Sequence, residues 1–309
     1  MNDGSTDSSG EIARKFAKEN SSVSSFDILN SGPSKARNIG IKKAKGEFIF
    51  FLDSDDYINS GALDTLYTHT KKSNVDLVIG NFTTLLDGKK FIPSKNILHF
   101  SKTKVLLRKQ INSYINLYLL RPNKYPLFAF SWGRLFKTKI LKKKNISFNQ
   151  DMRTFEDVDF NFRYLCYVEN IVYVKKSIIY HIINSSYSSA TMNIPKNYKQ
   201  FFGYKIALES ASNYLRKNKI TSNINPKIAQ AYSAYTIIQF IRLGLHYKKN
   251  NKELIKKIFY ELVNDSSLQD KISHYSPNKG DSRIIPILIK MKLSWLLLQF
   301  CRIKGRLRY

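Results

Sequence analysis

The feature that most constrains the fold is a short apolar run that ends in three carboxylates. Residues 47–56 read EFIFFLDSDD, so that Asp53, Asp55 and Asp56 directly follow the apolar residues. An uninterrupted run of this length is typical of a strand buried on both faces, as in a parallel sheet. In open α/β sheets, ligands bind at the carboxyl ends of the strands. The sequence therefore predicts an acidic ligand site at the edge of a buried sheet.

Strand-like and helix-like segments alternate through about residue 86. The apolar spacing predicts helices at 10–20, 35–46 and 60–73, and strands at 25–30, 47–56 and 75–86. This alternation predicts an α/β fold in which helices cover a sheet.

The pattern changes further along the chain. Residues 100–150 predict basic helices, residues 154–168 a helix that opens on acids, and residues 170–182 a strand. From Pro195 onward the pattern is helical and rich in Tyr and Lys. We therefore place a boundary near residue 192, between a domain at 1–192 and a mainly helical, basic region at 193–309.

The net charge limits the classes of partner. The chain has 51 Lys and Arg against 23 Asp and Glu, a formal charge of +28. Such a charge favours nucleic acid, an anionic membrane surface or phosphorylated substrates. The charge is spread along the chain and no nucleic-acid module is visible, which argues against nucleic acid. Cys166 and Cys301 stand far apart, which argues against a disulfide framework or zinc site and favours a reducing, cytosolic setting.

Each acidic motif has a chemical and a structural interpretation. Alternate carboxylates in DSD suit Mg²⁺ or Mn²⁺ bridging a diphosphate, whereas Asp56 could instead cap the next helix. Glu156 and Asp157 in TFEDVDF stand at a helix start, where a carboxylate can act as a general base. Helix N-termini also favour acids for electrostatic reasons alone.

Two upstream residues are open to the same pair of interpretations. Arg37, in SKARNIG, is placed to pair with phosphate oxygens or to remain a solvated helix residue. Asp3, in NDGSTD, follows a predicted strand end or belongs to a plain turn.

Together these motifs resemble the family 2 glycosyltransferases. The segments NDGSTD, NSGPSKARNIGIKKAKGEFIFFLDSDD, SWGRLFKTKIL and FEDVDF follow the order and approximate spacing of that family, over residues 2 to about 190. The resemblance implies a GT-A fold, with a Rossmann-like, nucleotide-binding mixed sheet and flanking helices. It also implies transfer of a sugar from a nucleotide-diphosphate sugar, most commonly a UDP-sugar, to an acceptor hydroxyl with inversion.

The resemblance assigns roles on the donor side. It implies that Asp3 contacts the base of the donor and that Arg37 lies beside the nucleotide. Asp53 and Asp55 match the family's DxD motif, which implies a Mn²⁺ or Mg²⁺ ion held chiefly by Asp55, with Asp53 nearer the ribose.

On the acceptor side, the resemblance implies that Asp157 is the catalytic base, with Glu156 beside it. Trp132, Gly133 and Arg134 would shape the acceptor site. YHIINSSYSS, at 180–189, matches a family loop near the diphosphate that usually reads YYYR....S.

His181 departs from that pattern. It stands in YHIINSSYSS where the family often has Tyr or Arg. Contact with the metal or diphosphate and a purely structural role both stay open.

The family's first strand and helix normally precede NDGSTD and are absent from this sequence. We therefore expect a domain that lacks its N-terminal strand. This leaves a catalytically inactive remnant, or a binding protein of the same fold, as the alternative function.

Residues 283–309 form a basic and apolar C-terminus, with seven Lys or Arg and no acid. The charges interrupt the apolar residues too often for a membrane span. The pattern predicts a helix that lies in an anionic membrane interface, or a core helix with a solvated basic end. The first interpretation favours a peripheral protein at the cytoplasmic face of the cell membrane. The acceptor would then be a saccharide or lipid-linked saccharide of bacterial surface polysaccharide or glycolipid synthesis.

Overall fold

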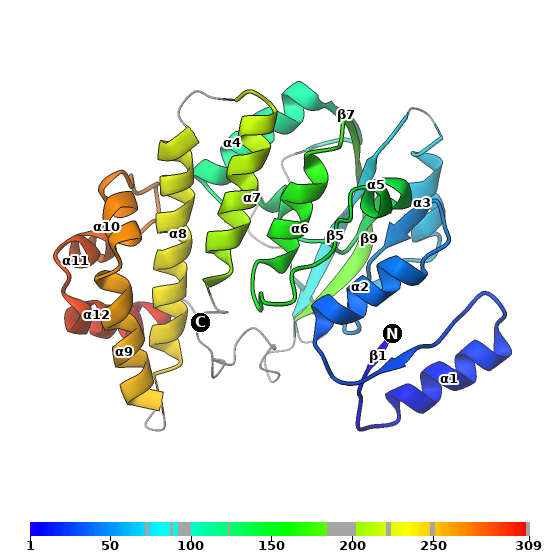
Figure 1. Cartoon of the computed structure of the whole chain (residues 1–309), viewed down its shortest axis with the longest axis horizontal. Helices are drawn as coiled ribbons and strands as arrows, with labels where there is room; N and C mark the ends of the chain where they lie inside the picture. The colour runs from blue at the N-terminus through cyan, green and yellow to red at the C-terminus, as the bar shows by residue number, and fades with distance from the viewer. Residues whose placement is uncertain are drawn as a thin grey trace. The chain divides into compact units, whose positions relative to one another are not determined.

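Figure 1 shows the chain in a computed structural model. It divides into two compact units: the first is Met1–Lys95, His99–Ile111 and Phe128–Tyr187, and the second is Asn96–Leu98, Asn112–Leu127 and Ser188–Tyr309. The domain boundary predicted near residue 192 lies outside the described residues and stays a prediction. The structure describes residues 1–71, 74–86, 89–91, 100–122, 124–183, 202–220, 224–247 and 251–306.

The first unit contains both helices and strands. Its helices are α1 (Ser9–Glu19), α2 (Pro33–Lys43), α3 (Ala62–Thr68), the start of α4 (Arg108–Leu120), α5 (Thr138–Lys143) and α6 (Glu156–Leu165). Its strands are β1 (Asn2–Asp3), β2 (Asp27–Ile28), β3 (Phe48–Phe50), β4 (Tyr57–Ile58), β5 (Leu77–Leu86), β6 (Lys89–Phe91), β7 (Lys104–Leu107), β8 (Arg134–Lys137) and β9 (Asn170–Ile183).

Most of these strands join one mixed sheet. Among the described residues its order is β3-β8-β5-β9-β4, with β6 against β5 and β7 against β9. β5 and β9 run parallel, whereas the other neighbours pair antiparallel. β1 and β2 form a separate two-stranded parallel sheet. The predicted mixed sheet with flanking helices is therefore confirmed.

The apolar run at 47–56 is a strand over a shorter range than predicted. Only β3 is a strand, and it pairs antiparallel with β8 at one end of the sheet order, so the prediction of a strand within a parallel sheet is wrong. Both of its faces are nevertheless covered. Phe48 and Phe50 pack on one core cluster, whereas Ile49 is buried on the opposite face and Phe51, directly after β3, contacts other aromatic rings. A strand covered on both faces has a continuous apolar sequence whether it pairs parallel or antiparallel. The sequence run therefore could not give the direction of pairing.

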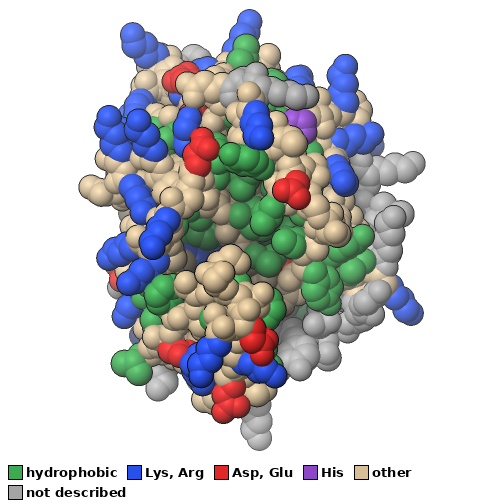
Figure 2. Space-filling model, turned by 90° about the vertical axis from the view of Figure 1, so that its right-hand side faces the viewer, with side chains coloured by type: hydrophobic (Ala, Val, Ile, Leu, Met, Phe, Trp, Pro, Cys, Tyr) green, Lys and Arg blue, Asp and Glu red, His purple; other side chains and the backbone are tan. Residues whose placement is uncertain are grey.

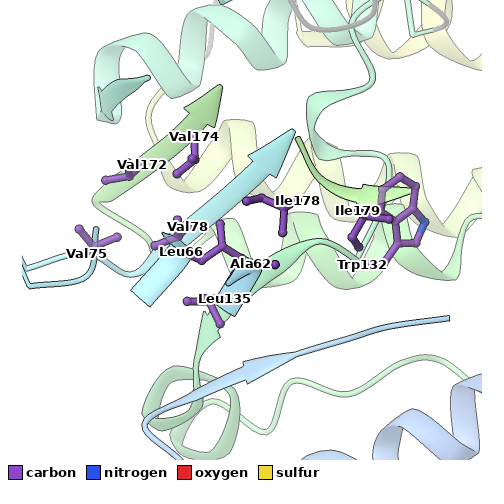
Figure 3. Close-up of a cluster of buried hydrophobic side chains, with 10 residues drawn as sticks. All are labelled: Ala62, Leu66, Val75, Val78, Trp132, Leu135, Val172, Val174, Ile178 and Ile179. Carbon is purple, nitrogen blue, oxygen red and sulfur yellow. The ribbon is translucent and has the colours of Figure 1, made fainter. Parts of the chain in front are cut away.

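Helices cover the two faces of this sheet. On one face, Leu135 of β8 packs in a buried cluster with Ala62 and Leu66 of α3 (Figure 3). The next residue, Phe136, packs edge-on against Phe160 of α6, with ring centroids 5.3 Å apart. Successive strand residues point to opposite faces, so α3 and α6 lie on opposite sides of the sheet.

Residues 100–150 are not all helical, contrary to the prediction. They include β7 and β8 as well as α4 and α5. β8 has only four residues, and its strand conformation depends on pairing with β3 and β5, which lie far away in sequence. Such tertiary pairing overrides local propensity.

β9 bends midway along its length. The register between β5 and β9 shifts twice. Lys175 and Lys176 are extra residues of β9 between the partners of Gly80 and Asn81, and Ile178 is extra between the partners of Asn81 and Phe82. Glycine fits at position 80 because an added Cβ would lie only 2.6 Å from Cγ1 of Ile178. Beyond the bulge β9 pairs with β4, which follows the acidic turn directly.

The side of the molecule that carries α1, α2 and α3 in Figure 1 exposes apolar side chains. Figure 2 shows such side chains gathered in a hollowed part of this side, bordered by Lys and Arg. Ile12 and Phe16, which form the apolar stripe that predicts α1, are both exposed, as are Leu63 and Tyr67 of α3. The apolar stripe of α1 thus faces outward.

In the second unit, all the regular secondary structure that the structure describes is helical. Its helices after α4 are α7 (Tyr204–Lys217), α8 (Ile224–Leu245), α9 (Lys252–Val263), α10 (Ser266–Ser273), α11 (Ile284–Lys290) and α12 (Ser294–Arg306). α8 contacts α7, α9, α10 and α12, and is therefore central to the unit. Among the described helices, none has the length and apolar character needed to cross a membrane.

The C-terminal helix predicted at 283–309 is two helices. α11 ends before Met291, and Lys292 adopts a positive φ of 55° before α12 begins. A non-glycine residue in this left-handed conformation breaks the helix. The predicted helical region is otherwise confirmed.

A buried amide ties α2 to the segment that precedes α6. Asn38 Nδ2 donates to the carbonyl of Phe148 over 2.8 Å, and its Oδ1 accepts from the Phe148 N–H over 2.7 Å. The neighbouring Arg37 has its guanidinium 5.2 Å from the centroid of the Phe148 ring. Asn38 therefore fixes the backbone on which Arg37 rests.

We expect Asn38→Ala to lower the free energy of unfolding by about 2–4 kcal/mol, because two buried backbone groups lose their partners. Urea denaturation followed by tryptophan fluorescence measures the change. Asn213→Ala, at an exposed position of α7, is the matched control and should stay within about 0.5 kcal/mol of the parent. Equal losses in the two variants would contradict the assignment.

Candidate active site

An acidic turn follows β3. The N–H of Asp56 donates to the carbonyl of Asp53 over 3.1 Å, which closes the turn. Asp53, Asp55 and Asp56 each offer a carboxylate oxygen, and these oxygens lie within 4.8 Å of one another. Carboxylate oxygens are the ligands that Mg²⁺ and Mn²⁺ prefer, so the donor set fits a hard divalent cation.

Asp56 belongs to this turn and does not cap the next helix. Its side chain is fully buried and accepts hydrogen bonds from the Ile182 N–H and from His181 Nδ1, each over 3.0 Å. α3 begins at Ala62, after Gly61. The cap interpretation of Asp56 is therefore wrong, and the residue instead links the turn to β9.

His181 is held on two sides. Its Nδ1 faces Asp56, and its ring stacks on Trp132 with centroids 5.1 Å apart. Burial lowers the pKa of His181, but the hydrogen bond and charge of Asp56 outweigh burial, and the pKa is raised. Because Nδ1 faces a carboxylate, Nε2 is the ring atom that could contact a ligand.

Arg37 joins the acidic turn to a second pair of acids. Its Nη2 donates to Asp53 Oδ1 over 2.8 Å, and its Nη1 lies 3.4 Å from Asp157 Oδ1 and 3.6 Å from Glu156 Oε1. Burial lowers the pKa of Arg37, but Asp157 and Asp53 more than offset burial, so that the pKa is raised. The guanidinium therefore stays charged.

Ser131 holds the carboxylate of Asp157. The Ser131 hydroxyl donates to Asp157 Oδ1 over 2.8 Å, and its N–H donates to Oδ2 over 3.2 Å. Burial raises the pKa of Asp157, which Arg37 and Ser131 only partly oppose. Sequence reasoning missed Ser131; the available signal was a small hydroxyl residue directly before Trp132 within an apolar stretch.

Glu156 and Asp157 open α6, but no side chain caps this helix at Phe155. Burial, with the neighbouring charge of Asp157, raises the pKa of Glu156 to about 7. A carboxyl group stabilises a helix N-terminus through its negative charge. Two adjacent carboxyl groups whose pKa values are raised are therefore poorly suited to that role. Their contacts with Arg37 and Ser131 place them in the same site as the acidic turn.

Three other predicted site residues have different surroundings. Both carboxylate oxygens of Asp3 accept backbone N–H bonds of 2.8 Å, from Ser31 and Gly32, so Asp3 fixes the loop before α2. Trp132 is buried in the core cluster of Figure 3, and Arg134 is buried within β8. Their roles toward donor base and acceptor stay predictions, and residues 184–189 of the predicted loop lie outside the described residues.

Comparison with known proteins supports the family resemblance. The sequence profile of glycosyl transferase family 2 matches residues 1–141, which include the acidic turn and Arg37. This match confirms the predicted resemblance to that family over residues 1–141. The chain is 23% identical to the glycosyltransferase EpsJ of Bacillus subtilis, covering 100% of this chain and 88% of EpsJ. It is 32% identical to the poly(ribitol-phosphate) beta-N-acetylglucosaminyltransferase TarP of Staphylococcus aureus, covering 54% of this chain and 47% of TarP.

The fold of the chain is GT-A. A crystal structure of S. aureus TarS in complex with UDP-GlcNAc superposes on it with a TM-score of 0.64 at 18% identity. The match covers 98% of this chain and 80% of the TarS chain. The predicted fold class is thereby confirmed.

The raised pKa of Glu156 predicts a stability that depends on pH. The folded state binds this proton more tightly than the unfolded state, so the carboxyl group costs stability as the pH rises from about 4.5 to about 7. We therefore expect Glu156→Gln to raise the free energy of unfolding by about 1–3 kcal/mol at pH 8 and to change it little at pH 4.5.

Urea denaturation at the two pH values measures this difference. Glu253→Gln is the control, because Glu253 is 81% exposed on α9 and should shift stability equally at both pH values. A Glu156→Gln gain that does not grow with pH would show that this carboxyl group ionises normally.

Proposed function

We propose that this chain transfers a sugar from a nucleotide-diphosphate sugar to an acceptor hydroxyl, with inversion and with a divalent cation. The observation that carries the proposal is the Arg37 bridge, which puts the acidic turn at Asp53 and the buried acid pair of α6 in one site. A UDP-sugar donor is supported by the UDP-GlcNAc complex of TarS, which has the same fold.

The acidic turn supplies the donor side of the site. Asp53 and Asp55 would hold Mg²⁺ or Mn²⁺, with Asp56 adjacent, and such a cation would stabilise the negative charge of the diphosphate leaving group. Arg37 holds the carboxylate of Asp53 in place through its 2.8 Å charge-assisted bond. Asp3 is the residue proposed to approach the donor base.

Asp157 is the proposed base. Its Oδ1 already accepts from Ser131 Oγ and lies near Arg37, whereas Oδ2 accepts one longer backbone bond. Oδ2 therefore has the greater capacity to take the proton of the acceptor hydroxyl. As that proton moves, the acceptor oxygen bonds to the anomeric carbon and the bond to the diphosphate oxygen breaks. A single displacement inverts the carbon, and the nucleoside diphosphate leaves.

The proposed acceptor is a saccharide or lipid-linked saccharide of bacterial surface polysaccharide or glycolipid synthesis. Support comes from relatives such as TarP and the poly(ribitol-phosphate) beta-glucosyltransferase of Bacillus spizizenii, whose names specify the polymer poly(ribitol-phosphate).

Thermal melting of the full chain with UDP, GDP and CDP, each with and without Mn²⁺, tests the donor site. We expect UDP to raise the melting temperature, and Mn²⁺ to enlarge the shift, because a ligand that binds only the folded state stabilises it. Asp55→Asn should remove the Mn²⁺-dependent part, whereas Asp64→Asn, exposed on α3, should not. No shift with any nucleotide would favour an inactive remnant over an enzyme.

Turnover of UDP-sugar tests the base. Asp157→Asn should lower kcat by roughly 10²–10⁴-fold, the usual effect of losing a general base, while the UDP-dependent melting shift persists. Ser131→Ala should lower kcat with little change in KM. It should also raise the pKa on the acidic limb of the pH–rate profile, because Asp157 loses the hydroxyl hydrogen bond that favours its ionised form and keeps only the backbone one.

Ser131→Thr keeps the hydroxyl and should restore part of the lost rate. Turnover that is unchanged in Asp157→Asn would sink the base assignment. A Ser131→Ala variant with normal kcat and an unshifted pH profile would limit Ser131 to a structural role.

A further inference from the structure

The last two helices present apolar side chains to solvent. Six of these are each between 45 and 62% exposed, and we refer to them as the C-terminal apolar surface: Ile284, Ile287, Met291, Trp295, Leu296 and Ile303. All belong to the second unit. The proposed transfer chemistry uses none of them.

α12 is apolar on two sides. Leu297, Leu298 and Cys301 are buried, and α12 packs on α8 and α9. Trp295 and Ile303 nevertheless remain 62 and 61% exposed. A helix at a water surface normally carries polar residues on its outer side, so this outer side is suited to a less polar neighbour.

α11 extends the same kind of surface. Ile284, Ile287 and Met291 follow the spacing of one helix face, while Ile285 and Ile289 are buried. Three residues separate α11 from α12, and the two helices contact each other. The exposed side chains of both helices therefore belong to one part of the unit.

Basic side chains are interspersed with this surface. Arg283, Lys290 and Lys292 are exposed, and the described residues from 283 to 306 contain no acid. The acids of the neighbouring helix α9 are already paired: Glu253 with Lys256 and Glu261 with Lys257. The local charge is thus positive and attracts an anionic partner.

We propose that the C-terminal apolar surface binds the interface of an anionic phospholipid bilayer. Exposed indole and aliphatic side chains insert at headgroup level, while lysine and arginine stems bury their methylenes and keep their charges at the phosphates. A soluble polyanion would satisfy the charges but would leave Trp295 and Ile303 in water. A bilayer matches both features, and the proposal does not depend on the transfer reaction.

Co-sedimentation of the full chain with lipid vesicles tests this proposal. We expect binding to phosphatidylcholine vesicles that contain about one third phosphatidylglycerol, weak binding to phosphatidylcholine alone, and loss of binding at high salt. Trp295→Ser combined with Ile303→Ser should weaken binding by about 10-fold or more, since two inserted side chains are removed. Lys290→Ser combined with Lys292→Ser should weaken binding and flatten its salt dependence.

Ile12→Ser is the matched control, because Ile12 is 64% exposed on α1 and should leave vesicle binding unchanged. Each variant should keep the UDP-dependent melting shift of the parent, which separates this test from that of the proposed function. Unchanged vesicle binding in the Trp295 and Ile303 double variant would overturn the proposal. So would a stable dimer without lipid that the same double variant converts to monomer, since a second copy would then cover the surface.

Discussion

The site depends on one buried cation among several carboxylates. Arg37 approaches Asp53, Glu156 and Asp157, which lie up to 120 residues away from it in sequence. Without it, these acids would repel one another in a poorly solvated space, at a cost of several kcal/mol. The positions of α2, the turn after β3 and the start of α6 are therefore coupled through a single guanidinium.

Arg37 offsets only part of that repulsion. Glu156 and Asp157 keep raised pKa values beside it, and the turn adds Asp55 and Asp56. A chain with a formal charge of +28 has few acids, yet several of them meet here. A site of this kind gains from added positive charge, which is why a divalent cation with its nucleotide fits it better than a free anion would.

The sequence predicts the parts of this site that are local, and misses those that depend on folding. The acidic turn after β3 and the acidic start of α6 are visible because each motif is continuous. The Ser131–Asp157 and Asp56–His181 contacts are not visible in the sequence, because the two residues of each contact lie 26 and 125 positions apart. β8 is missed for the same reason, because its strand conformation comes from pairing with β3 and β5.

The basic C-terminus shows why composition left two interpretations open. An apolar helix can be a core element or an interface element, and sequence periodicity cannot separate them when apolar residues occupy both sides. α12 packs Leu297, Leu298 and Cys301 inward, which accounts for the core pattern, and still exposes Trp295 and Ile303. The residues that pack α12 against its own unit thus differ from the residues that are available to a partner. The exposed residues can therefore be substituted without disturbing the buried ones.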